Sequence, residues 1–481
     1  RGRRVVLLDR DVEENMGALA KESFGGIWFA GTPLQRRYGI RDGAELGLRD
    51  WHSFAEFGPD DHWPRAWAEA YVHRANEEIF DWLKRIGVEF MPMPLWVERG
   101  LHTPGNSVPR WHIVWGTGHE LAVVLNRHLL AHPRRSLLEL RFGHRVESLV
   151  SANGRVTGCR GVLEGSDVEF EAQAESVVIA SGGINGDIAR VRQHWHTDWG
   201  RPPETILNGS HKYADGRLHD AAAALGANVT HLDWQWNYAA GVHHWKPRKP
   251  SHGLSLVPPK SALWLNWRGE RIGPMPLVTG FDTHDLVAQI CRQQRAYSWQ
   301  LLNRRIALKE LAVSGGEFNP AFREKKRLAV ARDMLFGNRW LVDELTRNCP
   351  DFVVADTLPE LVQKMNALTG DGSVDLASIT EAATCYDARI DAGPRFHNDE
   401  QLRRIEFARR WIGDRLRTCR FQKILDPKAG PLLAIREFII SRKSMGGLQT
   451  DLSCRVLDHA AQPIPGLYAA GECAGFVGSA M

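Results

Sequence analysis

An acidic residue at the end of an apolar strand is the first feature of this sequence that could do chemistry. Val5–Leu8 is a continuous aliphatic run, typical of a strand buried on both faces, and Asp9 follows it directly. In a dinucleotide-binding unit, an acid at this point accepts hydrogen bonds from the adenosine ribose. Taken alone, Asp9 is also consistent with a surface turn after any parallel strand.

Paired glycines are the second such feature. Gly25 and Gly26 follow Ser23 shortly after the acid, and Ser181-Gly182-Gly183 closes another buried-strand pattern. Without a Cβ in the way, such a backbone can approach a phosphate or a flat ring closely. The glycine loop that holds a pyrophosphate should lie roughly 20 residues before the acid, so we expect it upstream of Arg1.

Several strands are needed to position these residues. A hairpin is predicted from Val146–Val150, turning at Asn153-Gly154, because this dipeptide favours the turns that join antiparallel strands. Further strands are expected at Ser176–Ala180, Leu263–Trp267, Phe438–Ile440, Val456–Leu457 and Pro465–Ala469, the last of which runs toward Glu472.

The segment between about 285 and 425 has a mostly helical pattern. Thr357 or Asp356 can cap a helix over 359–368, because a short polar side chain accepts a hydrogen bond from the first helical turn. Residues 399–416 repeat apolar side chains on one face, which predicts an amphipathic helix.

Composition limits the class of protein. The chain has 481 residues and a formal net charge of +4, too mild a balance to suggest nucleic-acid binding. Hydrophobic residues make up 43% and charged residues 25%, as in ordinary globular proteins, and no apolar run approaches the length of a membrane span. The seven cysteines form no Cys-x-x-Cys pair, so we expect a reduced, cytoplasmic chain.

Histidines suggest no metal site at this stage. His243, His244 and His252 are close in sequence, but adjacent side chains diverge on a strand and no carboxylate spacing accompanies them. We therefore expect structural histidines and no metal.

Five features occur in an order that resembles one flavoprotein family. They are the acid-ended strand, Ser23–Gly26, Ala180–Gly183, Ser444–Gly447 and Gly466–Glu472. The sequence is similar to the family that contains fumarate reductase, succinate dehydrogenase and ketosteroid dehydrogenase. Within it, Gly280–Thr283 and Gly446–Asp451 resemble motifs of a bacterial branch of FAD-binding dehydrogenases. The likeness covers nearly the whole chain.

The resemblance implies an α/β fold with a split, Rossmann-like FAD-binding domain and an inserted, mostly helical α+β cap domain. We expect the FAD-binding domain at 1–259 and 439–481, and the cap or substrate domain at 260–438. These limits place a Pro-rich basic stretch, 246–250, before the entrance to the cap.

The resemblance also implies FAD as cofactor. In the family, Asp9 matches the ribose acid, Val146 a position near the adenine, and Glu472 the acid at the far part of the cofactor. The full set of matching positions is Asp9, Ser23, Gly25, Gly26, Val146, Ala180, Ser181, Gly182, Gly183, Asp215, Gly446, Gly447 and Glu472. Some relatives attach FAD covalently through a histidine just before the segment that matches Ser23–Gly26. No His occurs between Arg1 and Tyr38, so we expect non-covalent FAD.

Family chemistry requires a proton carrier and a polar group on a carbonyl, because hydride passes between flavin N5 and an activated C–C bond. By resemblance, Tyr297 in the cap is one candidate carrier; the alternative is that it packs in a helix with Trp299 and Leu302. Arg304 and Arg305 fall near the family's proton-donating arginine; the alternative for each is a surface position.

Lys443 is the best charged candidate, because it adjoins a glycine turn expected against the flavin; an interdomain salt bridge is its alternative. Gly446 and Gly447 could supply the backbone amide that polarises a ketone in ketosteroid dehydrogenases. The expected function is hydride transfer at a C–C bond next to a carbonyl. The expected substrate is a small molecule, with a steroid-like one as a candidate, and the sequence does not identify the electron partner.

Two other functions remain open. A soluble fumarate-reductase-type enzyme is one, although Arg442-Lys443 stand where that group has histidines and Arg271–Pro276 replaces its Thr-Glu segment. A non-catalytic fragment or binding protein unable to hold FAD is the other, because the phosphate loop and the last flavin-binding helix are expected outside this chain.

Overall fold

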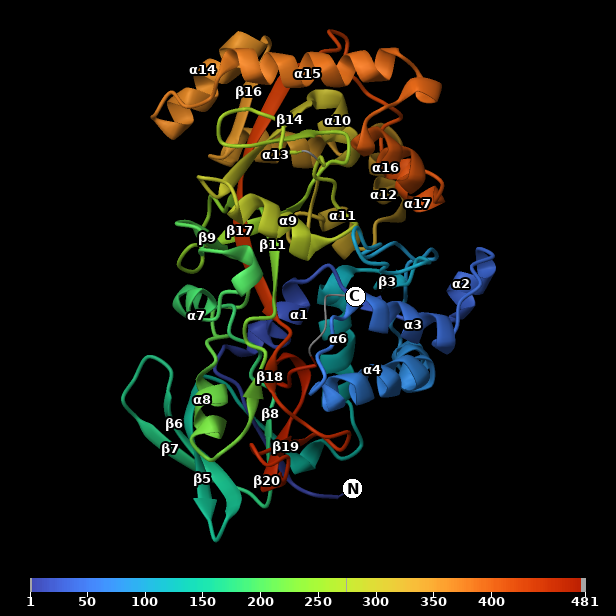
Figure 1. The fold of residues 1–481 in the computed structure, drawn as a ribbon. Coiled ribbons are helices and arrows are strands. Elements are labelled where there is room, and N and C mark those ends of the chain that lie inside the picture. The colour runs from blue at the N-terminus through green and yellow to red at the C-terminus, as the bar shows by residue number, and fades with distance from the viewer. Residues whose placement is uncertain (1, 274, 477–481) are drawn as a thin grey trace.

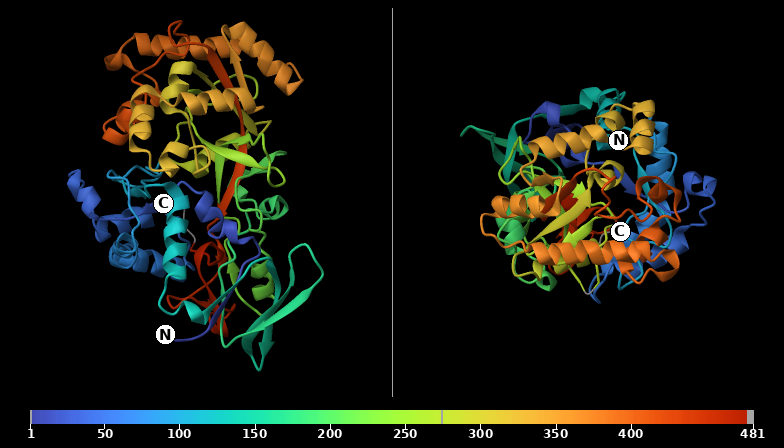
Figure 2. Two further views of the ribbon diagram at one scale, coloured as in Figure 1. Left: turned by 180° about the vertical axis from the view of Figure 1, so that it is seen from behind. Right: turned by 90° about the horizontal axis from the view of Figure 1, so that it is seen from above.

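The computed structural model describes residues 2–273 and 275–476. One long strand, β17 (Leu432–Ser444), runs along an elongated molecule (Figure 1). It connects a helical end, with α14 (Leu358–Thr369) and α15 (Leu376–Asp391), to an end that contains a hairpin of β5 (His144–Ala152) and β6 (Arg155–Leu163). Helices of the first 130 residues lie together beside the lower half of β17, as both side views show (Figures 1 and 2).

Two short parallel strand pairs lie at the hairpin end. β1 (Val5–Leu8) pairs with β4 (Leu138–Arg141), and β8 (Val177–Ile179) pairs with β20 (Pro463–Ala469). The strands predicted before Asp9 and before Ser181 are thus confirmed. The predicted burial of β1 on both faces is wrong for the described residues: Val5 and Val6, whose side chains point to opposite faces, are 52% and 45% exposed, so neither face is covered at the start of β1.

The predicted hairpin is confirmed. Asn153 and Gly154, with φ of 51° and 70°, take the left-handed conformation that a tight turn between β5 and β6 requires. β7 (Glu169–Gln173) adds a third antiparallel strand to this sheet.

An eight-stranded sheet surrounds β17. The other members are β9 (Ile206–Asn208), β11 (Gln235–His243), β12 (Gly253–Val257), β13 (Leu263–Leu265), β14 (Tyr297–Asn303), β15 (Ala312–Val313) and β16 (Phe352–Ala355). β14 pairs with β17 from Tyr297 opposite Phe438 to Asn303 opposite Leu432. Helical packing of Tyr297 is therefore wrong, since β13 and β17 hold this segment extended from both sides. β17 is continuous through position 438, where we drew a domain limit; the limits remain a prediction.

Helices cover the sheet in the upper half of Figure 1. They are α9 (Thr283–Cys291), α10 (Arg304–Glu310), α11 (Pro320–Arg323), α12 (Arg327–Phe336), α13 (Arg339–Asn348), α14, α15, α16 (Glu400–Ala408) and α17 (Ile412–Arg417). The predicted cap of α14 is confirmed, because the Thr357 hydroxyl accepts the Glu360 N–H. The single helix predicted over 399–416 is instead two, α16 and α17. Trp411 is extended between them, with its ring 6.0 Å from that of Tyr38, so a tertiary contact overrides the helical pattern.

The remaining helices and strands are mostly short. They are α1 (Ala18–Glu22), α2 (Pro33–Arg37), α3 (Ala44–Phe54), α4 (His62–Ala75), α5 (Asp81–Arg85), α6 (Thr117–Leu130), α7 (Ile188–Gln193), α8 (Arg217–Ala223), β2 (Gly26–Trp28), β3 (Trp111–Ile113), β10 (Val229–Thr230), β18 (Gly447–Leu448) and β19 (Arg455–Leu457). Among the described residues, none of the helices is both long and apolar enough to cross a membrane.

A buried acid interrupts the apolar interior of the large sheet. Glu437 of β17 is 0% exposed, and neither carboxylate oxygen has a hydrogen-bond partner within the described residues. Burial raises the pKa of Glu437 well above its usual range, because an unpaired charge is costly in this environment. Burial thus favours the protonated, neutral form of this side chain in the folded protein.

Replacing this acid gives a pH-dependent change in stability. The unfolded chain loses the Glu437 proton near its ordinary pKa while the folded chain retains it, so stability falls as pH rises above that value. We expect Glu437→Gln to gain about 1.4 kcal/mol of unfolding free energy over wild type per pH unit between pH 5 and 7, measured by urea denaturation. The exposed Glu381 of α15 provides the matched control, Glu381→Gln; equal pH dependence in all three proteins would contradict the neutral state of Glu437.

Candidate active site

Three turns that are far apart in sequence meet at the lower end of β17. A Cβ built on Gly183 would lie 2.5 Å from both Ser444 Oγ and Glu472 Oε1. Glu472 Oε1 accepts the Ser444 N–H at 2.9 Å. A Cβ on Gly446 would overlap the His231 carbonyl, and one on Gly447 the Cys473 carbonyl. We call Gly183, Ser444, Gly446, Gly447 and Glu472 the turn cluster; only glycine fits its three closest contacts.

The end of β1 contacts the loop before α8. The Arg10 guanidinium binds Asp215 at 2.8 Å and Glu164 at 2.7 Å. The predicted ribose acid, Asp9, accepts the Asp11 N–H at 2.9 Å through its own carboxylate. The two predicted acids, Asp9 and Asp215, are thus brought to one neighbourhood by Arg10.

The same loop also contacts the turn after β8. Gly186 N–H donates to the Ala214 carbonyl at 2.8 Å, and a Cβ on Gly182 would meet only Ala214 Cβ, at 3.7 Å. Gly182 has φ +80°, while Ala180 and Ser181 are exposed. The outer face of this turn therefore presents backbone and small side chains, as a flat dinucleotide requires.

Ser23, Gly25 and Gly26 form a separate strip beside α6. A Cβ on Gly25 would lie 2.5 Å from the Gly118 nitrogen, and one on Gly26 would overlap the Trp111 indole. The Ser23 carbonyl accepts the Gly118 N–H at 3.1 Å. Val146 lies partly buried in β5, paired with Gly161. Gly182, with the exposed Ala180 and Ser181, leaves backbone open at the end of β8, while the buried Gly183, Gly446 and Gly447 let the ends of β8 and β17 pack closely. With Asp9 directly after β1, this arrangement suits FAD.

A pocket with aromatic walls adjoins the turn cluster at Met445. It has room for about 20 Å³ of water-accessible volume and is lined by Phe54, Glu98, Trp199, Trp234, Gln235, Trp236, Asn237, Asp282, Thr283, His284 and Met445. We call it the aromatic pocket. Neither lysine nor arginine is among these lining residues. Sequence spacing could not identify it, because its walls come from α3, β11, α9 and the loop around Glu98; the dense tryptophans at 234 and 236 were the one local signal.

Glu98 is a buried acid in the wall of the aromatic pocket. Its Oε1 accepts the Thr283 hydroxyl at 2.6 Å, and its Oε2 accepts the Thr283 N–H at 2.9 Å, at the first residue of α9. Burial raises the pKa of Glu98 to about 7, although both hydrogen bonds from Thr283 oppose the shift. The group can therefore hold a proton at neutral pH.

Lys443 is the predicted catalytic residue that the structure places nearest the pocket. Its Nζ lies 4.0 Å from the centroid of the Trp236 ring, a lining residue. Burial lowers the pKa of Lys443 to about 8, and the neighbouring Glu472 opposes that shift. The amine can therefore change its charge close to physiological pH.

The other three predicted catalytic residues do not line the aromatic pocket. Tyr297 packs beside Phe438, with its buried hydroxyl lacking a hydrogen-bond partner among the described residues. Arg304 pairs with Asp343 at 2.7 Å and Arg305 with Asp426 at 2.9 Å, with both arginines partly exposed on α10. The catalytic roles of these three residues remain predictions, since none of the three lines the pocket.

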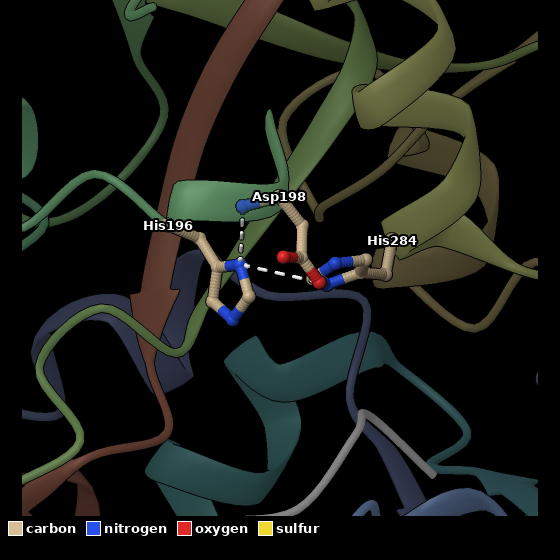
Figure 3. A group of neighbouring side chains, drawn as sticks. All are labelled: His196, Asp198 and His284. Atoms are coloured by element: carbon tan, nitrogen blue, oxygen red, sulfur yellow. Dashed lines mark hydrogen bonds and ion pairs between the residues drawn. The ribbon is translucent and has the colours of Figure 1, made fainter. Parts of the chain in front are cut away.

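A histidine and acid group lies at one edge of the pocket (Figure 3). His196, Asp198 and His284 converge, with one potential ligand atom from each within 4.8 Å of the others. His196 Nδ1 accepts the Asp198 N–H at 3.3 Å, and its Nε2 lies 3.7 Å from Asp233. A shared cation would have to displace that N–H. No sequence pattern indicated this group, because His284 lies in α9, far along the chain from the turn that holds His196 and Asp198.

Comparison with known proteins supports FAD as the cofactor. A family model described as FAD binding domain matches residues 1–480. A KsdD-like steroid dehydrogenase of Mycolicibacterium smegmatis is 40% identical over 99% of this chain and 90% of its own length.

Solved structures share the fold at low sequence identity. The 3-ketosteroid Δ1-dehydrogenase of Sterolibacterium denitrificans has a TM-score of 0.63 and 16% identity, over 98% of this chain and 90% of that one. The open conformation of a flavocytochrome c3 fumarate reductase has a TM-score of 0.63 and 18% identity, over 99% and 73%. The mixed helix-and-strand architecture is thus that of FAD-binding flavoenzymes. With a family match across nearly its whole length and a relative 40% identical, the chain belongs to the FAD binding domain family, alongside the KsdD-like steroid dehydrogenases.

Proposed function

We propose that this chain is an FAD-dependent dehydrogenase that oxidises a C–C bond next to the carbonyl of a flat, steroid-like molecule. One observation carries the proposal: the aromatic pocket, which holds a proton-carrying acid, adjoins the glycine-rich turn cluster at Met445. Similarity to KsdD-like steroid dehydrogenases supports the same substrate class.

In this proposal, the split dinucleotide-binding domain and its cap are those expected from the sequence. Asp9 would bind the ribose, Val146 would lie near the adenine, and Ser23, Gly25 and Gly26 would run beneath the pyrophosphate and ring. Positions 180–183, Asp215, Gly446, Gly447 and Glu472 would complete the non-covalent FAD site. When bound, the flavin supplies hydride acceptance at N5.

The lining of the aromatic pocket favours an apolar substrate over a dicarboxylate. Phe54, Trp199, Trp234 and Trp236 offer flat apolar surface. The open space between them is about 20 Å³, so a bulky substrate requires these side chains to move apart. Glu98 and Asp282 are acids, and no lining lysine or arginine offsets them. Two substrate carboxylates would therefore find no cationic partner among the lining residues, which argues against the fumarate-reductase alternative.

Two buried groups near the pocket are suited to moving the substrate proton. Glu98, held by Thr283, can retain a proton at neutral pH, and Lys443 can accept one once it is neutral. We propose Lys443 as the proton acceptor, because it also adjoins the turn cluster through Ser444. Gly446 and Gly447 would offer backbone N–H groups to the ketone.

A substrate comparison tests the proposed function. Protein reconstituted with FAD is mixed anaerobically with a saturated 3-ketosteroid or with succinate, and the flavin absorbance band is followed. We expect bleaching by the ketosteroid at least about tenfold faster than by succinate, a difference of about 1.4 kcal/mol in barrier. Faster bleaching by succinate would favour the fumarate-type alternative, and protein that stays colourless with added FAD would favour the non-catalytic one.

Asp9→Ala tests the cofactor site separately from turnover. Loss of a hydrogen bond to a charged group costs about 1.5–3 kcal/mol, so FAD should bind at least about tenfold more weakly, as measured by equilibrium dialysis. The exposed Asp356 before α14 gives the control variant Asp356→Ala. If Asp9→Ala retained wild-type affinity, Asp9 would not bind the ribose.

Lys443→Met tests the proton acceptor. The wild-type kcat/KM should rise as pH increases through about 8, where the lysine becomes neutral, and Lys443→Met should lose this step and most of its activity. Lys364→Met, at a surface pair with Glu360, is the matched control and should keep the wild-type profile. A step near pH 8 that persists in Lys443→Met would assign it to another group.

A further inference from the structure

Helix α12 and the start of α13 leave large apolar side chains in solvent. Leu328 is 89% exposed, Phe336 75%, Leu335 65% and Trp340 47%. We call these four residues the apolar ridge. Scattered exposed apolar residues are ordinary, but four large ones within thirteen positions mark an interaction surface.

The spacing of the ridge places its members together. Leu328, Leu335 and Phe336 stand at i, i+7 and i+8, so they share one face of α12. Gly337 then turns the chain with φ +88°, and a Cβ there would lie 2.6 Å from the Leu308 carbonyl oxygen. Asn338 N–H donates to that carbonyl at 3.0 Å, which anchors the junction and leaves Trp340 on the following turn.

Basic side chains surround the ridge. Between positions 323 and 340 the sequence has six lysines and arginines against two acids, Glu324 and Asp333. The side chains of Arg327, Arg332 and Lys326 are 80%, 66% and 63% exposed, and Arg339 is also exposed. Arg332 shares the α12 face with Leu328 and Leu335, because it lies four residues after the first.

We propose that the apolar ridge docks this protein onto the surface of a bilayer that contains anionic lipids. Protruding leucine, phenylalanine and tryptophan side chains would enter the interface, while the lysines and arginines meet lipid phosphates. This is peripheral attachment by one helix and the turn that follows it.

Charge favours a membrane over a second copy of the chain. In a symmetric dimer the same patch meets itself, so Arg332 and its basic neighbours would face their own copies. Like charges would oppose that contact, whereas an anionic surface is complementary to all of them. The ridge side chains also protrude from a helix. Protruding side chains can insert into a lipid interface, whereas a protein partner is more often bound in a preformed groove.

The segment that precedes the apolar ridge contacts the region around the strip of Ser23, Gly25 and Gly26. Phe322 of α11 stacks on Phe24 with ring centroids 5.3 Å apart and meets Trp115 at 4.7 Å. Lys325 pairs with Glu120 of α6 at 2.8 Å. α11 and α12 lie on the same side of the molecule as α6 and β3 (Figure 1). Docking would bring this side to the phase in which an apolar substrate dissolves; that consequence rests on the proposed function, but the docking does not.

Vesicle co-sedimentation tests the docking. Full-length chain is mixed with vesicles of phosphatidylcholine alone or with added phosphatidylglycerol. We expect binding to the anionic vesicles, at least about tenfold weaker binding on phosphatidylcholine, and loss of binding as salt is raised. The double variant Leu328→Asp with Phe336→Asp should bind anionic vesicles at least about tenfold more weakly.

Controls keep the outcome decisive. Val168, 57% exposed between β6 and β7, gives the control Val168→Asp, which should bind as wild type. Circular dichroism checks that the double variant is folded. The proposal is overturned by equal binding of wild type and double variant, by no binding to anionic vesicles, or by a wild-type dimer in sedimentation velocity that the double variant loses without any vesicle binding. None of these readouts depends on flavin or turnover, so the proposed function can fail independently.

Discussion

Backbone packing at the lower end of β17 is the constraint on which the rest of the structure depends. Gly183, Gly446 and Gly447 each approach another segment more closely than a side chain would allow. Ser444 and Glu472 secure the same junction by a hydrogen bond from N–H to carboxylate. Because β17 is continuous from this junction into the large sheet, fixing the turns also fixes the helical end relative to them. The aromatic pocket exists where that strand ends.

Burial sets the electrostatics of this pocket. It raises the pKa of Glu98 to about 7 and lowers that of Lys443 to about 8, so both groups change charge in the range where a dehydrogenase must move a proton. The same effect favours the neutral form of Glu437 in the sheet, but there no hydrogen-bond partner is present among the described residues. Glu98 and Glu437 thus differ in their partners: Thr283 holds the first in a defined position at the pocket wall.

Exposed and buried aromatic residues have different roles in this structure. Trp199, Trp234 and Trp236 form walls of the pocket, and Phe322 joins α11 to Phe24 beside α6. Phe336 and Trp340, only a few positions later, remain in solvent among basic side chains. The apolar ridge and the aromatic pocket both suit an apolar substrate. The ridge would bring the protein to a lipid phase, and the pocket would enclose the substrate.

The sequence by itself determined the local elements and the kind of cofactor. Apolar runs predicted β1, β8 and β20, Asn153-Gly154 predicted the hairpin, and Thr357 predicted the start of α14, because each signal lies within a few residues. The order of the glycine motifs resembled a flavoprotein family, and that resemblance implied FAD. Only the tertiary structure decided that Tyr297 lies in a strand, that Trp411 divides a predicted helix, and that Glu98 and Thr283 meet Trp236 across one pocket. These outcomes depend on contacts between residues that are far apart in the sequence, and no local pattern encodes such contacts.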